Sequence, residues 1–124
     1  MGRIREFSCH SCGEVWQLQL GHGMNHAALE NVLEVFSEDI QKRILEDTQE
    51  EQIPSFEFNY CPAVCGQCRR IVEIPSIYLH HSGRTYLGVC PSCNNQVEVF
   101  LEGKGSCPHC GSNCLLESDI GRWD

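Results

Sequence analysis

The sequence lacks long hydrophobic runs, and none of its apolar stretches approaches the roughly 18 residues that a membrane span requires. Its opening residues, MGRIREFSC, also lack the apolar core of a signal peptide. We therefore expect a cytoplasmic protein without membrane contact, whose thiols stay reduced. In a reducing compartment, closely spaced cysteines bind metal or carry redox chemistry more often than they form structural disulfides.

Basic residues are also scarce, because 9 lysines and arginines stand against 17 acids and give a net charge of −8. The acidic excess lies in residues 25–57, which hold nine acids and two bases. Non-specific nucleic-acid binding needs a basic surface, so the overall charge disfavours it. It stays an alternative because a few residues could form a local basic patch with aromatic rings for stacking. These residues are Arg69, Arg70, Arg84, Lys104, Tyr78 and Tyr86.

The chain shows neither a nucleophile–base pair nor a phosphate-binding loop, so we predict that it is not an enzyme. His22 and His26 have the four-residue spacing of the zincin motif HExxH, but the glutamate of that motif is missing. Gly21 and Gly23 flank His22 and favour a loop. We therefore interpret the two histidines as polar groups of a loop and a helix start.

Cysteine, by contrast, is abundant, with ten among 124 residues, or about 8%. Eight of them form four CxxC pairs: Cys9 and Cys12, Cys65 and Cys68, Cys90 and Cys93, and Cys107 and Cys110. Two intervening residues let one tight turn present both sulfurs to one ion, and two such turns complete the tetrahedron of a structural zinc site. We predict two zinc ions per chain, with iron as the alternative because it accepts the same thiolate shell.

The four CxxC pairs can combine into two sites in three ways. We favour Cys9/Cys12 with Cys65/Cys68, and Cys90/Cys93 with Cys107/Cys110, because the second combination closes a short loop at low entropic cost. A rival arrangement joins Cys65/Cys68 to Cys90/Cys93 across the turn at residues 80–84, and leaves the outer pairs to each other. Cys61 and Cys114 are left over. We expect them to be small buried apolar groups, with entry into a metal shell as the alternative.

The hydrophobic pattern predicts a small, metal-stabilised α+β fold with two zinc-ribbon-like β units. Alternating residues indicate strands before and after the first three cysteine pairs, but not after the fourth. A helical stripe lies at about residues 25–52, inside the first unit; it consists of Leu29, Val32, Leu33, Phe36, Ile40 and Ile44. Asn25 and Ser37 are candidate N-caps, so the helix can break in two at Ser37, and Pro54 ends it. We place one unit at residues 1–79 and the other at residues 80–124.

The first 80 residues resemble the CpXC-type bacterial zinc-binding domains. The matching positions are Cys9, Cys12, Gly13, Phe58, Cys65, Cys68, Pro75, Tyr78 and Leu79. The second CxxC departs from the family pattern, since CGQC replaces CPxCG and Cys61-Pro62 lies upstream, which leaves open whether Cys61 rather than Cys65 is a ligand. The resemblance implies metal binding and says little about activity, because the family is functionally uncharacterised. Residues 80–124 resemble only the general zinc-ribbon class.

These observations favour a non-enzymatic module that binds a protein partner. If four protein sulfurs surround each ion, no position is left for water or substrate. The acidic helical segment is then the candidate surface for the partner, because the rest of the chain is nearly neutral. The sequence does not identify the partner.

Overall fold

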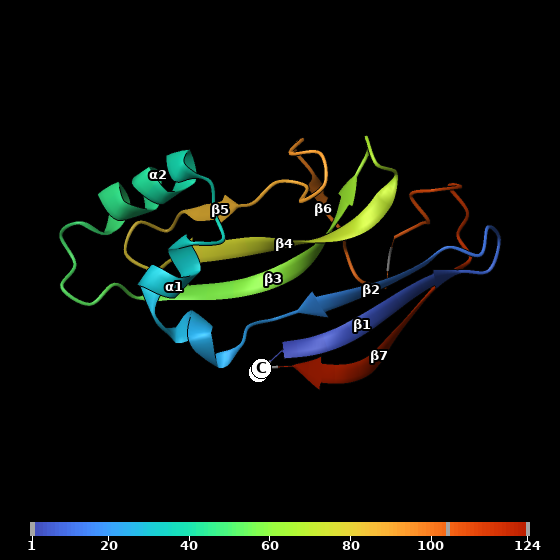
Figure 1. Cartoon of the computed structure of the whole chain (residues 1–124), viewed down its shortest axis with the longest axis horizontal. Helices are drawn as coiled ribbons and strands as arrows, with labels where there is room; N and C mark the ends of the chain where they lie inside the picture. Colours follow the sequence, from blue (N-terminus) through green and yellow to red (C-terminus); the bar gives the residue numbers. More distant parts are fainter. Residues whose placement is uncertain (1, 104, 124) are drawn as a thin grey trace.

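The computed structural model describes residues 2–103 and 105–123 and consists of two antiparallel sheets with helices at one end (Figure 1). The three-stranded sheet has the order β2-β1-β7, and the four-stranded sheet has the order β5-β4-β3-β6. The strands are β1 (Gly2–Cys9), β2 (Val15–Leu20), β3 (Phe56–Cys65), β4 (Arg70–Leu79), β5 (Thr85–Leu87), β6 (Glu98–Val99) and β7 (Leu115–Trp123). The helices are η1 (Met24–Ala27), α1 (Leu29–Leu33) and α2 (Glu38–Thr48). The prediction of a small mixed fold of strands and helices is thus confirmed, with two antiparallel sheets in place of two consecutive ribbons. No helix in the described ranges is long and apolar enough to cross a membrane.

Both sheets combine strands from the two halves of the chain. β7 runs antiparallel along the whole of β1, from the pair Gly2 and Trp123 to the pair Cys9 and Leu115. Likewise, β5 joins β4 and β6 joins β3. The boundary that we placed between residues 79 and 80 therefore does not separate one sheet from the other. Instead, the end of the chain closes onto its beginning.

The helical insert breaks at Ser37, as predicted, and the Ser37 hydroxyl accepts a hydrogen bond from the Ile40 N–H at 3.5 Å. The prediction that Asn25 caps the first helix is wrong. Asn25 lies inside η1, where its carbonyl accepts a hydrogen bond from the Asn31 side chain, and α1 begins only after Ala28. The two short helices lie over the end of β3 and β4 where Phe56 pairs with Leu79, opposite the turn between Cys65 and Arg70 (Figure 1).

The hydrophobic core has three parts. The predicted helical stripe packs on the outer ends of β3 and β4; the buried members of this cluster are Val32, Phe36, Ile44, Phe58, Ile77 and Leu79. A second cluster joins the two sheets, with the rings of Phe7 and Phe100 edge to face at 5.5 Å. A third cluster consists of Ala63, Cys65, Val72, Ile74 and Cys90. Because the second cluster draws on strands of both sheets, neither sheet is an independent domain.

Trp123 locks the last strand to the rest of the molecule, although the sequence shows no partner for it. Its indole N–H donates a hydrogen bond to the Leu20 carbonyl at 2.9 Å, and its ring packs near Tyr60. A Cβ atom at Gly2 would lie 2.1 Å from the Trp123 ring, so the paired strand must carry glycine there.

Candidate metal centres

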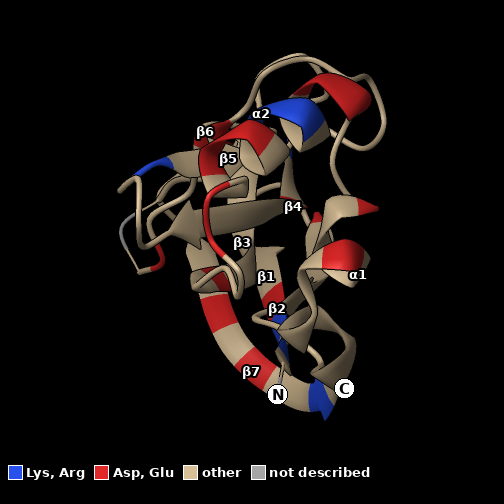
Figure 2. Cartoon of the chain, turned by 90° about the vertical axis from the view of Figure 1, so that its left-hand side faces the viewer, with Lys and Arg blue, Asp and Glu red and all other residues tan. Residues whose placement is uncertain are grey.

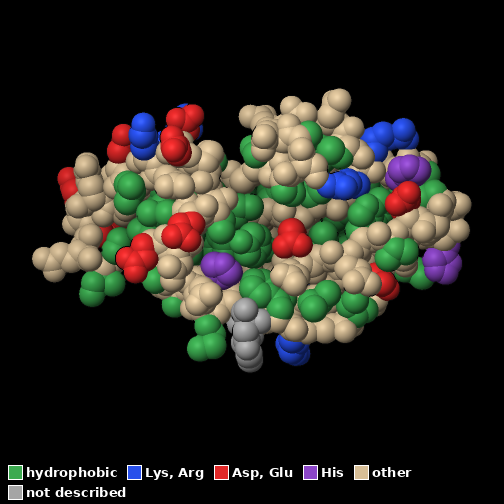
Figure 3. Space-filling model, viewed as in Figure 1, with side chains coloured by type: hydrophobic (Ala, Val, Ile, Leu, Met, Phe, Trp, Pro, Cys, Tyr) green, Lys and Arg blue, Asp and Glu red, His purple; other side chains and the backbone are tan. Residues whose placement is uncertain are grey.

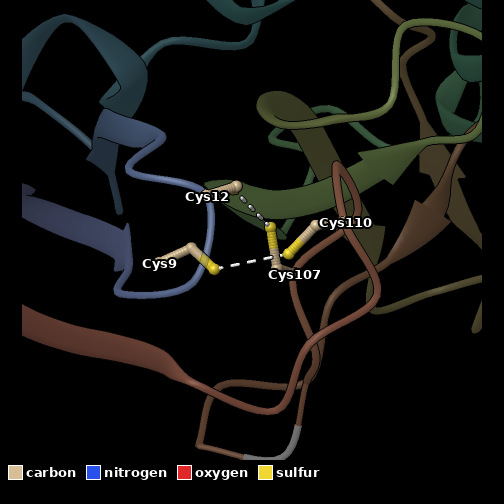
Figure 4. A group of neighbouring side chains, drawn as sticks. All are labelled: Cys9, Cys12, Cys107 and Cys110. Carbon is tan, nitrogen blue, oxygen red and sulfur yellow. Dashed lines mark hydrogen bonds between the residues drawn. The ribbon is translucent and has the colours of Figure 1, made fainter.

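The eight cysteines of the CxxC pairs gather into two groups of four. Site A comprises Cys9, Cys12, Cys107 and Cys110, and site B comprises Cys65, Cys68, Cys90 and Cys93. Within each group all four sulfurs lie within 4.8 Å of one another. In site A the side chains converge from the turn after β1 and from the loop before β7 (Figure 4). Two four-cysteine groups that could bind metal are therefore present.

The favoured pairing is wrong, and the rival arrangement is the one observed. The first and last CxxC pairs share site A, while the two middle pairs share site B. Doubling a loop costs only about 0.6 kcal/mol of closure entropy, so loop length is a weak guide. The ladder between β1 and β7, together with the Phe7–Phe100 contact, outweighs that cost and carries Cys107 to Cys9.

All four CxxC segments fold into the same turn. In each, the backbone N–H of the residue after the second cysteine donates to the carbonyl of the first cysteine, at 2.7–2.9 Å. These donors are Gly13, Arg69, Asn94 and Gly111, and each has a positive φ between 55° and 79°. The sequence indicates this for the two glycines. It does not indicate it for Arg69 and Asn94, whose only signal is their position after a CxxC pair.

The sulfur spacing fits a metal ion better than it fits a disulfide. The cross-turn Sγ–Sγ distances are 3.6 Å for Cys9–Cys110 and 3.7 Å for Cys12–Cys107 in site A. In site B they are 3.5 Å for Cys65–Cys93 and 3.9 Å for Cys68–Cys90. A tetrahedral zinc with Zn–S bonds of about 2.3 Å places its sulfurs about 3.8 Å apart. A disulfide would need about 2.05 Å, so the thiols are already arranged as a four-thiolate shell.

Hydrogen bonds favour a thiolate in each site. The backbone N–H of Asn95 and three neighbouring thiols lower the pKa of Cys93 to about 6, against the opposing effect of burial. In site A the backbone N–H of Cys12 is the main cause that lowers the pKa of Cys9 to about 7. The Cys68 thiol has its pKa raised to about 12, chiefly by its hydrogen bond to Cys93. Each site thus concentrates negative charge on one sulfur, where a cation would bind first.

Cys61 and Cys114 lie outside both groups. Cys61, in β3, is half-buried beside the cluster around site B, and burial raises its pKa. The structure therefore places Cys65, not Cys61, with the other site B cysteines. Cys114 is exposed, contrary to the expectation of a buried apolar group, and its N–H donates to the Ser112 hydroxyl.

His22 and His26 belong to the polar loop, as interpreted from the sequence. The His22 ring lies 3.1 Å from the Asn59 amide oxygen, and His26 accepts a hydrogen bond from the Gly23 N–H at 2.8 Å. The His26 ring packs on Phe58 at 4.5 Å, and burial lowers its pKa. Within the described residues, neither histidine joins a group of metal-ligating side chains.

Two sets of polar contacts that the sequence did not reveal support the sites. The Arg69 guanidinium, next to site B, donates to the carbonyl of His109 inside a site A turn at 2.5 Å. Arg3 and Arg5 bind Glu102 at 2.7 Å and 3.0 Å, which fastens the segment leading to Cys107 onto the three-stranded sheet. The hydrogen bond from Arg69 to His109 thus joins the turn of one site to the turn of the other.

The residues of the proposed basic patch are not gathered. Arg69 and Arg70 lie at the start of β4, whereas Arg84 follows its far end. Arg84 forms an ion pair with Asp47 at 3.4 Å, and the Tyr86 hydroxyl donates to the same carboxylate at 2.6 Å. Lys104 lies outside the described residues. Arg69, Arg70 and Arg84 therefore do not form the single basic patch that the sequence suggested.

Comparison of the chain with protein-family models, with curated proteins and with solved structures gives no match. The resemblance of residues 1–80 to the CpXC-type domains stays a prediction from short motifs. Function is therefore inferred from the two cysteine groups and from the surfaces around them.

Proposed function

We propose that this chain is a zinc protein in which two closed four-cysteine sites hold together a non-enzymatic protein-interaction module. The observation that carries the metal part is the spacing of 3.5–3.9 Å between cross-turn sulfurs in both sites. That spacing matches the distance between two sulfurs bound to one tetrahedral zinc ion. The resemblance to CpXC-type domains supports the same conclusion.

Structural sites suit this geometry better than catalytic ones. Each site offers four protein sulfurs, and a catalytic zinc needs a position left open for water or substrate. When bound, zinc supplies cross-links between distant turns. The chain itself supplies the geometry of each site, because backbone hydrogen bonds close the four CxxC turns that carry the sulfurs.

A protein partner is favoured by the surface of the helical insert. Residues 25–57 carry nine acids and two bases, and Figure 2 shows acidic residues along α1 and α2. Exposed hydrophobic side chains lie in the same segment, with Leu45 50% and Ile53 91% exposed. Apolar groups beside charges of one sign are typical of surfaces that recognise other proteins.

The metal part is tested by elemental analysis and native mass spectrometry of protein purified without added metal. We expect two zinc ions per chain. Iron in place of zinc would correct the identity of the metal. A folded chain without metal would overturn the proposal.

The interaction part is tested by affinity capture with the full chain and a charge-reversed variant. Glu46→Lys with Glu50→Lys changes the insert, and Glu14→Lys with Glu98→Lys changes the same number of solvent-accessible acids outside residues 25–57. We expect the first pair to lose specific partners and the control pair to keep them. Identical partners for both variants would exclude the insert as the docking surface.

A further inference from the structure

A groove separates the helical insert from the loop that carries a site B turn. Its volume is about 670 Å³, within the range of about 300–1,000 Å³ for ligand pockets. Figure 3 shows hydrophobic side chains on this face, where the surface is hollowed between α2 and the loop that follows β5. The apolar lining consists of Val35, Phe36, Ile40, Tyr60, Pro75, Val89 and Pro91.

Glu73 is the one charged residue in the lining of this groove. It belongs to β4 and is half-buried, and burial raises the pKa of its carboxyl group. One carboxylate oxygen accepts the Gln19 backbone N–H at 3.1 Å. Among the residues that the structure describes, no lysine, arginine or histidine forms an ion pair with it. The groove thus contains a partly desolvated carboxylate that has no cation.

Acidic residues also stand next to the groove lining in the sequence of α2. Ser37 lines the groove, and Glu38 and Asp39 follow it in the first turn of α2. A guanidinium or ammonium group would supply the missing countercharge to Glu73. The aliphatic stem of an arginine or lysine would in turn cover apolar walls such as Phe36 and Pro75.

We propose that this groove binds a segment of a protein partner that presents one arginine or lysine between apolar side chains, with the cationic group on Glu73. The proposal rests on the proposed function, because it specifies the chemistry of the partner. A second copy of this chain is the other possible source of such a segment, and the experiment distinguishes the two.

The probe is an acetylated leucine–arginine–leucine tripeptide amide, titrated to millimolar concentration into the zinc-loaded full chain while backbone NMR shifts are recorded. The neutral control peptide carries citrulline in place of arginine. Glu73→Gln removes the charge but keeps an oxygen that can accept the Gln19 N–H. Glu98→Gln, an exposed acid in β6, is the matched control for net charge.

We expect shift changes at Val35, Val89 and their neighbours with the arginine peptide. Glu73→Gln should weaken binding by at least about tenfold, as for a lost charge-assisted hydrogen bond. Glu98→Gln should change it by less than about twofold, because salt screens a distant charge. Equal binding of both peptides, no shift changes, or unchanged binding by Glu73→Gln would each overturn the proposal.

Two further outcomes separate this inference from the proposed function. If the Glu73→Gln variant still captures the partners and the charge-reversed insert does not, the module binds proteins and the groove proposal fails. If the peptide binds but no partner depends on the insert, the groove stands and the proposed module fails. Self-association that Glu73→Gln abolishes in sedimentation would assign the groove to a second copy, and so overturn the proposal.

Discussion

The residue after each CxxC pair has a backbone conformation that most side chains avoid. Gly13 and Gly111 adopt it freely, whereas Arg69 and Asn94 adopt it with φ of 55° and 61°. Asparagine tolerates the left-handed region, and arginine rarely does so. The Arg69 side chain compensates by its hydrogen bond to the His109 carbonyl in the other site.

Replacing Gly13 or Gly111 by alanine should lower the free energy of unfolding of the zinc-loaded protein by about 1–2 kcal/mol, the cost of a left-handed non-glycine residue. Gly66 is the matched control, because it lies inside a CxxC turn without a positive φ and an added Cβ would meet nothing within 4 Å. Denaturant titration measures the effect. Equal losses at Gly13 and Gly66 would contradict the explanation.

Paired cysteine replacements can also verify which CxxC pairs share a site. The double variant Cys12→Ser with Cys110→Ser should keep one metal ion, because both residues belong to site A. Cys12→Ser with Cys93→Ser should lose both ions, and Cys114→Ser should keep two. Native mass spectrometry counts the ions. Complete metal loss from the first double variant would support the pairing that the structure rejects.

Acid should remove metal from both sites. The pKa values of Cys9 and Cys93, about 7 and about 6, lie below the ordinary thiol value of 9.0. Thiols with a lowered pKa in the folded state stabilise it fully above their ordinary pKa, and this contribution is lost as the pH falls through the lowered values. Protons compete with metal for the same sulfurs. Mass spectra along an acid titration should show both ions lost as the pH falls through about 7 and about 6; metal that stays fully bound well below these values would contradict the prediction.

At the scale of elements, the helical insert was the easiest part to predict. Its stripe at helical spacing meets the side chains of β3 and β4, and the acids at the start of α2 follow an N-cap at Ser37. These signals are local, so the sequence displays them without knowledge of the rest of the fold.

Ile44→Ala should destabilise the zinc-loaded protein by about 2–5 kcal/mol, because Ile44 is fully buried and its loss leaves a cavity between α2 and the four-stranded sheet. Leu45→Ala, at the next position of the same helix, should change stability by less than about 0.5 kcal/mol because Leu45 is 50% exposed. Thermal and denaturant unfolding of both variants provide the comparison. A similar cost at both positions would mean that the insert does not pack as described.

β7 was missed for a physical reason. The segment Leu115–Trp123 does not alternate between apolar and polar residues, and Leu116 and Ile120 are exposed. It forms a strand because β1 offers a complete edge and because Arg5 binds Asp119 at 2.8 Å and Glu117 at 3.2 Å. The ligand candidates and their turns could thus be read from spacing, but their pairing depended on a long-range strand contact that spacing does not encode.

At the scale of the whole molecule, strong chelation should unfold the chain cooperatively. Each structural zinc contributes on the order of 10 kcal/mol at neutral pH, and the three small core clusters leave little stability without it. Circular dichroism during chelation, with mass spectra of the same samples, would show structure and metal lost together. A metal-free chain that still melts cooperatively would exclude metal as the main source of stability.

The nesting of one site inside the other has a consequence during translation. Cys68 and Cys90 are 22 positions apart, whereas Cys12 and Cys107 are 95 positions apart. At about 5–20 residues per second, the ribosome releases the second half of site A roughly 5–20 seconds after the first half. All ligands of the inner site leave the ribosome before Cys107 does, so the inner site is complete first, and Cys9 and Cys12 meanwhile stay open to other metals and to oxidants. The order of synthesis would then set the order in which a newborn chain acquires its two ions.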